Sequence, residues 1–151
     1  MVLEEILLSC DKPWILKSYE NALADRFQWT IILNGKSMMN LETLYDEISK
    51  AFHFPPYFGR NYNALSEMLS DLSWFERNAY SILVENSSFV LADEKESALT
   101  GLLDVLSNVG EEWSQPIDQG EPWDRPSIPF HAIFQIDKAE MRTPLKALPL
   151  V

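Results

Sequence analysis

Three short apolar runs, each separated from the next by segments of helical periodicity, constrain the fold of this chain most strongly. They occupy residues 29–34, 80–85 and 130–136. A run that is apolar at successive positions is typical of a strand buried on both faces of a sheet. Because each connection contains at least one helical segment, the order predicts an α/β fold with a three-stranded parallel sheet and right-handed crossovers.

The first connection contains two segments whose apolar residues recur at helical spacing. Asn40 can cap a helix over residues 41–52, and Asn61 can cap a second helix over residues 62–72. The two prolines before Tyr57 disfavour helical backbone, so the first helix must end by about residue 54. The sequence therefore predicts two helices separated by a tight turn.

A third helix is predicted in the second connection. Asp93 and Glu96 have the spacing of a capping box, with Asp in the position usually held by Ser or Thr. Apolar residues then follow at helical spacing as far as Val109. Gly110 either ends the helix or precedes one further turn over residues 111–113.

Two segments flank a domain that is predicted over residues 29–137. Residues 1–28 are an N-terminal extension, and helical spacing over residues 15–27 predicts a helix that packs on the domain. Residues 114–129 contain four prolines and predict an ordered, extended loop. Residues 138–151 contain two more prolines and suggest a mobile C-terminal tail.

Negative charge is concentrated in the middle of the chain. The 151 residues carry a formal net charge of −11, and residues 61–124 hold 13 carboxylates against two cations, Arg77 and Lys95. Such a field repels phosphate backbones and attracts basic proteins. The charge therefore argues against direct nucleic-acid binding and is consistent with a basic protein partner, although the need for solubility alone also explains an acidic surface.

Composition also bears on the compartment and on the number of domains. A hydrophobic content of 46% in 151 residues fits one compact domain. No apolar run approaches the roughly 20 residues of a membrane helix, and Glu4 and Glu5 stand where a signal peptide is basic. Cys10 is the single cysteine, so no intrachain disulfide forms. These features predict a cytoplasmic protein with no membrane partner.

Side chains suited to catalysis or metal binding are sparse. Neither of the two histidines, His53 and His131, has a nucleophile or acid in a catalytic spacing nearby. No phosphate-binding loop, nucleophile elbow or zinc spacing occurs. The carboxylates of Asp118, Glu121 and Asp124 do not have the spacing of a calcium loop and are expected to hold loop backbone by hydrogen bonds. We expect no cofactor, no metal and no enzymatic activity.

The stretch from Phe54 to Glu67 instead has the features of a binding surface. Pro55, Pro56 and Gly59 build a rigid turn around Tyr57 and Phe58, of which at least one ring should project. Asn63, Glu67 and Asp71 recur four residues apart and form one polar stripe on the helix that follows. We expect Tyr57, Asn63 and Glu67 to share an exposed surface, with Glu67 outside any core ion pair with Arg60 or Arg77.

From Phe54 to Leu65 the chain matches the pattern apolar-Pro-x-Tyr-aromatic-Gly-x-Asn-x-(Asp or Asn)-Ala-Leu. At this stretch it resembles the barstar family, small intracellular proteins that inhibit ribonucleases of the barnase type by plugging the active site. The resemblance extends over about residues 29–137 and implies a barstar-like fold. It also implies that Tyr57 is an aromatic contact, while Asn63, Glu67 and Asn108 match positions that are acidic in the family's best-known member.

The predicted function is therefore an inhibitor, or immunity protein, of a basic ribonuclease. The predicted partner-binding residues are Tyr57, Phe58, Arg60, Asn61, Asn63, Ala64, Glu67, Asp71 and Asn108. One alternative is an acidic interaction module whose basic partner is no nuclease. Another is a small hydrolase that uses Glu67 and Glu85 as an acid/base pair.

Overall fold

The computed structural model describes residues 2–151 and contains one four-stranded sheet. The strands are β1 (Ile15–Ser18), β2 (Ile31–Asn34), β3 (Tyr80–Glu85) and β4 (Phe130–Gln135), in the spatial order β1-β4-β3-β2. All three neighbouring pairs are parallel, with Ile31 opposite Ile82 and Ile82 opposite Ala132. The α/β class and the parallel pairing of the three predicted strands are confirmed.

The fourth strand, β1, lies in the N-terminal extension, so the predicted three-stranded sheet and the helix over residues 15–27 are wrong. Within that range only α2 (Leu23–Arg26) is helical. Ile15 and Leu16 are buried on opposite faces of the sheet, as alternation along a strand requires. The helical spacing of the sequence is local, whereas β1 is stabilised by pairing with β4, more than a hundred positions away.

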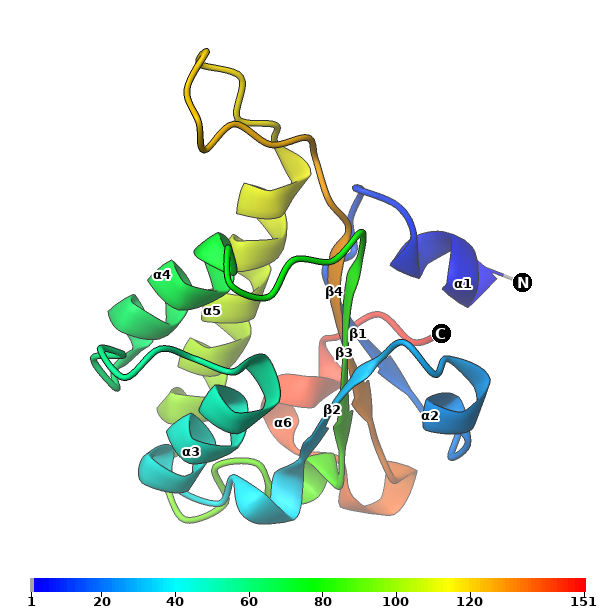
Figure 1. Ribbon diagram of the computed structural model, residues 1–151. Helices are drawn as coiled ribbons and strands as arrows, with labels where there is room; N and C mark the ends of the chain where they lie inside the picture. Colours follow the sequence, from blue (N-terminus) through cyan, green and yellow to red (C-terminus); the bar gives the residue numbers. More distant parts are fainter. Residues whose placement is uncertain (1) are drawn as a thin grey trace.

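Helices cover both faces of the sheet (Figure 1). On one face lie α3 (Leu41–Phe52), α4 (Tyr62–Asp71) and α5 (Glu96–Ser114), which pack over the larger core cluster. On the other face α1 (Val2–Leu7) and α2 contribute Leu3, Leu7, Leu23 and Phe27 to a smaller cluster with Leu16, Leu83 and Ile133. The N-terminal extension therefore supplies one strand and covers the face of the sheet opposite α3, α4 and α5.

Helix caps agree with the sequence for α3 and α4 but not for α5. The Asn40 side chain accepts a hydrogen bond from the Thr43 amide at 2.9 Å, and that of Asn61 accepts one from the Ala64 amide at 2.8 Å. The predicted Asp93 cap is wrong, because α5 begins only at Glu96 and has no side-chain cap bond. The segment before α5 is drawn toward α3, where the Glu94 carboxylate accepts from the Leu41 amide at 3.0 Å.

Gly110 lies inside α5, which continues to Ser114. A Cβ atom at this position would come within 2.6 Å of the Cβ and Cγ atoms of Trp14. Glycine is therefore required by the close approach of the residue that precedes β1, at the cost of helix propensity.

The two ends of the chain meet around β1 and β4. The imidazole of His131 in β4 lies 2.8 Å from the carbonyl oxygens of both Pro13 and Ser9, which links the extension to the sheet.

Three short helical turns, η1 (Gly35–Ser37), η2 (Ser87–Phe89) and η3 (Lys138–Glu140), follow strand ends, and α6 (Thr143–Lys146) follows η3.

The C-terminal segment, for which the sequence suggests mobility, runs beside the outer edge of β1. The Lys17 amide donates to the Pro149 carbonyl at 2.8 Å, the Val151 amide donates to the Lys17 carbonyl at 3.0 Å, and Leu145 is fully buried. None of the helices within residues 2–151 is long and apolar enough to cross a membrane.

Candidate functional site

The turn between α3 and α4 exposes one of its two neighbouring aromatic rings. Phe58 packs edge-on against Tyr45, with ring centroids 5.6 Å apart, and against Phe54 at 5.0 Å. Tyr57 makes no such ring contact among the described residues and is 72% exposed. Phe58 therefore anchors the turn on α3, and Tyr57 projects from it.

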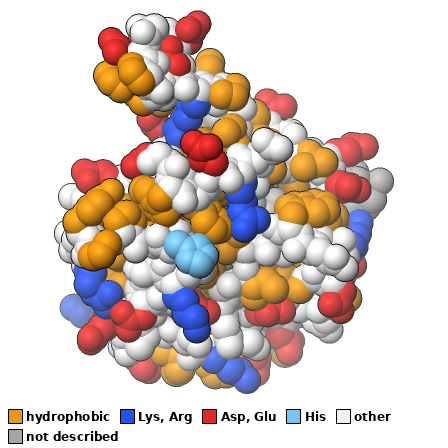
Figure 2. Space-filling model, in the orientation of Figure 1, with side chains coloured by type: hydrophobic (Ala, Val, Ile, Leu, Met, Phe, Trp, Pro, Cys, Tyr) orange, Lys and Arg blue, Asp and Glu red, His pale blue; other side chains and the backbone are white. Residues whose placement is uncertain are grey.

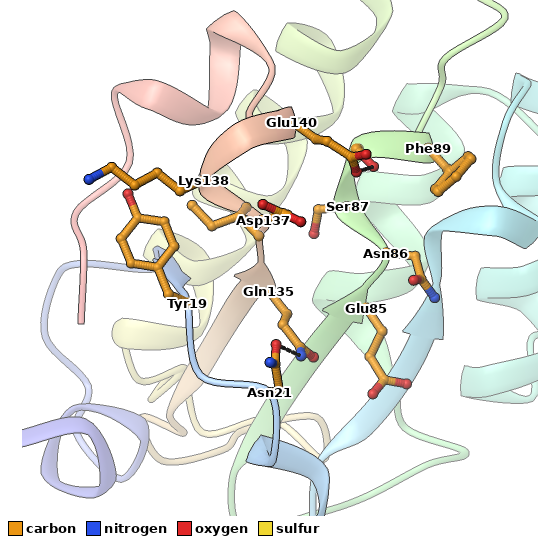
Figure 3. A pocket seen from close by; sticks show the side chains of 12 residues that line it. Tyr19, Asn21, Glu85, Asn86, Ser87, Phe89, Gln135, Asp137, Lys138 and Glu140 are labelled. Atoms are coloured by element: carbon orange, nitrogen blue, oxygen red, sulfur yellow. Dashed lines mark hydrogen bonds between the residues drawn. The ribbon is translucent and has the colours of Figure 1, made fainter.

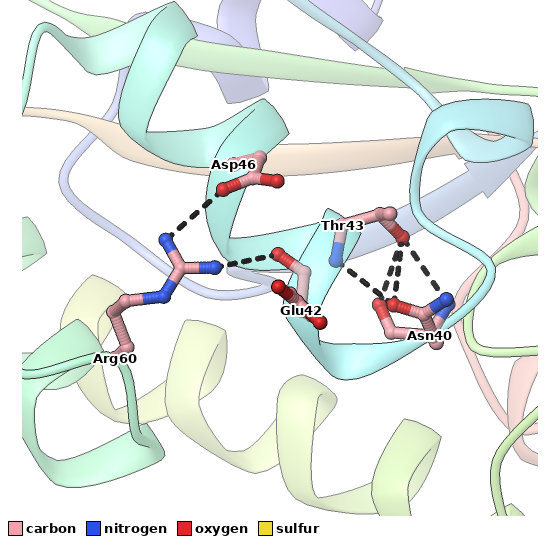
Figure 4. A network of polar contacts seen from close by, with 5 residues as sticks. All are labelled: Asn40, Glu42, Thr43, Asp46 and Arg60. Carbon is pink, nitrogen blue, oxygen red and sulfur yellow. Dashed lines mark hydrogen bonds and ion pairs between the residues drawn. The ribbon is translucent and has the colours of Figure 1, made fainter.

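Arg60 ties the turn to the start of α3 (Figure 4). Its guanidinium donates to the Glu42 carbonyl at 2.9 Å, lies 3.0 Å from the Asp46 carboxylate and stands 5.7 Å above the Tyr45 ring. Arg60 itself has a φ of +52°, the left-handed conformation that directs the chain back toward α4. The contacts with α3 fix the position of the turn.

The beginning of α4 is fixed by Asn61 and Ala64. The Asn61 side chain caps the helix and also donates to the Gly59 carbonyl at 3.3 Å. A Cβ atom on Gly59 would come within 3.2 Å of the Ala64 Cβ atom, so glycine allows the turn to close on the helix. These residues shape the surface beside Tyr57.

Asn63, Glu67 and Asp71 are exposed along one side of α4, while Leu65 and Leu69 are buried. Within the part of the chain that the structure describes, no hydrogen bond or ion pair engages the Glu67 carboxylate. It pairs with neither Arg60 nor Arg77, whose guanidinium lies 4.5 Å from the Phe75 ring centroid. Tyr57, Asn63 and Glu67 are thus all exposed, and a carboxylate is available to a partner.

α5 packs behind α4 and carries Asn108 on its exposed face. The Tyr62 hydroxyl donates to the Ala98 carbonyl, and the Trp113 indole donates to the Leu69 carbonyl at 2.7 Å. Burial raises the pKa of Tyr62 far above that of an exposed phenol, so its hydroxyl remains a donor. These two bonds hold α4 against α5 at both ends. On the side of the molecule formed by α3 and α4, exposed hydrophobic side chains lie beside charged ones (Figure 2).

Glu85 lies elsewhere, in a crevice of about 560 Å³ at the carboxyl ends of β1, β3 and β4 (Figure 3). The crevice is lined by Tyr19, Asn21, Glu85, Asn86, Ser87, Ser88, Phe89, Gln135, Ile136, Asp137, Lys138 and Glu140. Glu67 is not among these residues. The two carboxylates proposed as a hydrolase pair therefore do not share this crevice.

Residues 2–151 contain no group of three or more His, Cys, Asp or Glu side chains arranged to hold a metal ion. In the loop after α5, the Asp124 carboxylate accepts hydrogen bonds from the amides of Gln119 and Gly120, at 3.0 and 2.7 Å. It orders the loop backbone, as expected for a carboxylate in that position.

Two features of the surface were not predicted from the sequence. Asp46 of α3 pairs with Arg60 of the turn that follows this helix, and Trp123 is 62% exposed at the tip of the loop after α5. In the sequence, the exposure of Trp123 is indicated only by its place between a proline and an aspartate in a predicted loop. The pairing of Asp46 had no signal, because it depends on the left-handed backbone at Arg60.

Two comparisons identify similar proteins. A family model described as "Barstar (barnase inhibitor)" matches residues 29–135. The chain is also 40% identical over 40 residues to the protein named "Putative ribonuclease inhibitor YrdF" from Bacillus subtilis (strain 168). That alignment covers 26% of this chain and 44% of the relative, so the chain spans less than half of the relative's length. Because the family model matches most of the chain, including the turn and α4, this protein belongs to the barstar family.

Proposed function

We propose that this protein inhibits a basic ribonuclease by covering its active site with the surface of the α3–α4 turn and α4. This 57–71 surface comprises Tyr57, Phe58, Arg60, Asn61, Asn63, Ala64, Glu67 and Asp71, with Asn108 beside it on α5. The observation that carries the proposal concerns the Glu67 carboxylate, which has no hydrogen-bond or ion-pair partner within residues 2–151 and is exposed on the helix that follows the projecting Tyr57 ring. Membership of the family and the name of the relative support a ribonuclease as the partner.

The residues of the 57–71 surface have different roles in this proposal. Tyr57 is an aromatic anchor, and Glu67 forms charge-assisted hydrogen bonds with an arginine or lysine of the nuclease cleft. Asn63 adds uncharged hydrogen bonds. Phe58, Arg60, Asn61 and Ala64 hold the turn and the helix start in place, so that little ordering is needed on binding.

The negative net charge of the protein supports the choice of a basic partner. A basic ribonuclease is attracted over a distance by the −11 net charge and is then blocked by a surface that mimics the charge of RNA. We propose that the protein is not an enzyme and acts in the cytoplasm, protecting against a toxic nuclease without binding nucleic acid itself. The second candidate is an acidic module for a non-nuclease partner, and the net charge is the observation that favours it. This candidate predicts a complex that leaves nuclease activity intact.

The test compares three substitutions that each remove one carboxylate. Glu67→Ala should weaken inhibition of a purified ribonuclease of the barnase type by about tenfold or more, because it leaves a buried cation of the nuclease unpaired. Asp118→Ala and Glu121→Ala, on exposed loop positions, should mainly slow association and lose their effect as salt rises above physiological strength. Stopped-flow binding at low and high salt measures the association and dissociation rates of each variant. Equal losses for all three variants that vanish together in salt would favour the acidic module.

A further inference from the structure

The proposed function does not involve the loop after α5 or the groove beside it. Residues 114–129 project beyond the end of α5 and away from the sheet (Figure 1). Trp123, near the tip, is 62% exposed. Tryptophan is enriched among the residues that contribute most to binding at protein interfaces, so an exposed indole on a projecting loop is a candidate binding anchor.

The loop is held in one conformation by contacts at its tip and at its base. Asp124 bonds two backbone amides of the tip, and Ile117 and Arg125 exchange backbone hydrogen bonds of 2.9 and 3.0 Å. At the base, the Arg125 guanidinium lies 3.4 Å from the Trp113 ring centroid and donates to the Ser70 carbonyl at 2.8 Å. Trp123 is therefore presented on an ordered loop, which lowers the entropy lost when a partner binds.

A groove of about 860 Å³ separates this loop from the end of α4. Tyr80, Trp113, Ile117 and Ile128 supply apolar lining, and Trp123 and Asp71 also line it. Asp71 is the last residue of α4 and belongs to the 57–71 surface as well. The groove is therefore continuous with the surface proposed to cover the ribonuclease.

The balance of charge around the groove is negative and favours a basic occupant. Asp71, Glu76 and Asp124 line the groove, and Asp118 and Glu121 are exposed on the same loop as Trp123. Arg77 and Arg125 also line the groove, and their contacts with the Phe75 and Trp113 rings do not neutralise them, so the lining itself carries three carboxylates against two guanidinium groups. In Figure 2 the part of the molecule that projects at the top carries acidic and hydrophobic side chains together.

We propose that this groove and Trp123 form a second arm of the binding surface, which contacts the same basic ribonuclease beside its active site. The inference rests on the proposed function and extends it along α4. A ten-residue helix spans about 15 Å, so Asp71 and the groove lie within reach of a partner seated on Tyr57. A stable interface usually involves roughly 20–30 residues on each side, more than the 57–71 surface supplies.

Binding kinetics with a purified ribonuclease of the barnase type test the second arm. Trp123→Ala should raise the dissociation rate by about tenfold or more at both low and high salt, while Trp123→Phe retains most of the affinity. Tyr19→Ala is the matched control, because Tyr19 is an exposed aromatic residue that lines the crevice at the carboxyl ends of the strands. This control should leave both rates unchanged.

A second variant, at an exposed position of the loop, tests the second arm without removing a side chain that packs in the fold. Glu121→Lys places a cation on the exposed loop near Trp123 and should slow association with the basic ribonuclease more than Glu121→Ala, with an unchanged urea midpoint. If Trp123→Ala and Glu121→Lys bind like the wild type while Glu67→Ala binds weakly, the second arm is overturned and the proposed function stands. If the wild type does not bind the ribonuclease, both are overturned.

Discussion

At the scale of single residues, Tyr57 and Phe58 show how neighbouring aromatic residues take different roles. The sequence predicted that at least one of the two rings projects, because Pro55, Pro56 and Gly59 build a rigid turn around them. The structure exposes Tyr57 and packs Phe58 on Tyr45 and Phe54. The position of Arg60 could not be predicted, since its contacts with α3 depend on its own positive φ and on a second element.

This difference gives a matched pair of substitutions. Tyr57→Ala should leave the free energy of unfolding within about 0.5 kcal/mol of the wild type, because the ring is mostly in water, but should weaken inhibition by about tenfold. Phe58→Ala should lower the free energy of unfolding by about 1–3 kcal/mol, since the ring is partly buried against two others. Urea unfolding and a ribonuclease inhibition assay, run on both variants, separate the roles. A destabilised Tyr57→Ala would show that Tyr57 is a packing residue.

At the scale of elements, the sequence predicted the strands and helices that have a clear local signal and missed a strand whose residues also have helical spacing. The caps at Asn40 and Asn61 and the three parallel strands were predicted because capping and apolar runs are local signals. The strand β1 was missed because it forms by pairing with β4, and its residues also have helical spacing. The start of α5 was misplaced because Glu94 bonds α3.

Gly110 provides a test of how β1 docks on α5. Alanine has the higher helix propensity, yet Gly110→Ala should lower the free energy of unfolding by about 1–3 kcal/mol, because the new methyl group would overlap Trp14. Thr100→Ala, at an exposed position of the same helix, is the control and should change it by less than about 0.5 kcal/mol. Denaturant unfolding measures both. A stabilised Gly110→Ala variant would mean that Trp14 does not pack closely on α5.

At the scale of the whole molecule, the N-terminal extension adds a strand and a covered face to the domain matched by the family model. It is joined to β4 through His131, which is fully buried between two carbonyl oxygens. This arrangement leaves the 57–71 surface, on the opposite side of the sheet, free of the extension (Figure 1). The sequence predicted a packed extension but not which face it covers.

The burial of His131 predicts how stability depends on pH. Burial lowers the pKa of His131, although hydrogen bonds to the two carbonyls oppose the shift. The unfolded chain, with an ordinary histidine pKa of about 6.5, therefore binds the proton first as pH falls. The stabilising contribution is present above about pH 6.5 and is lost as pH decreases toward the folded pKa, by at most about 1.4 kcal/mol per pH unit.

Urea unfolding at pH values between about 7 and 5.5 checks this expectation. His131→Gln should be less stable at about pH 7 and should show a flatter pH dependence than the wild type. Thr100→Ala, which removes no titratable group, should retain the wild-type dependence. A wild-type stability that rises on acidification would show that the two carbonyls outweigh burial and that His131 is charged in the folded protein.

The central claim is that the 57–71 surface covers a ribonuclease, and amide hydrogen exchange tests it most directly. Exchange is measured on the protein alone and in complex with a purified ribonuclease of the barnase type. The account predicts slower exchange in the complex for residues 57–71 and 117–125, and unchanged exchange at the carboxyl ends of the strands, residues 85–89 and 135–140. Protection confined to residues 85–89 and 135–140, with residues 57–71 unchanged, would contradict it.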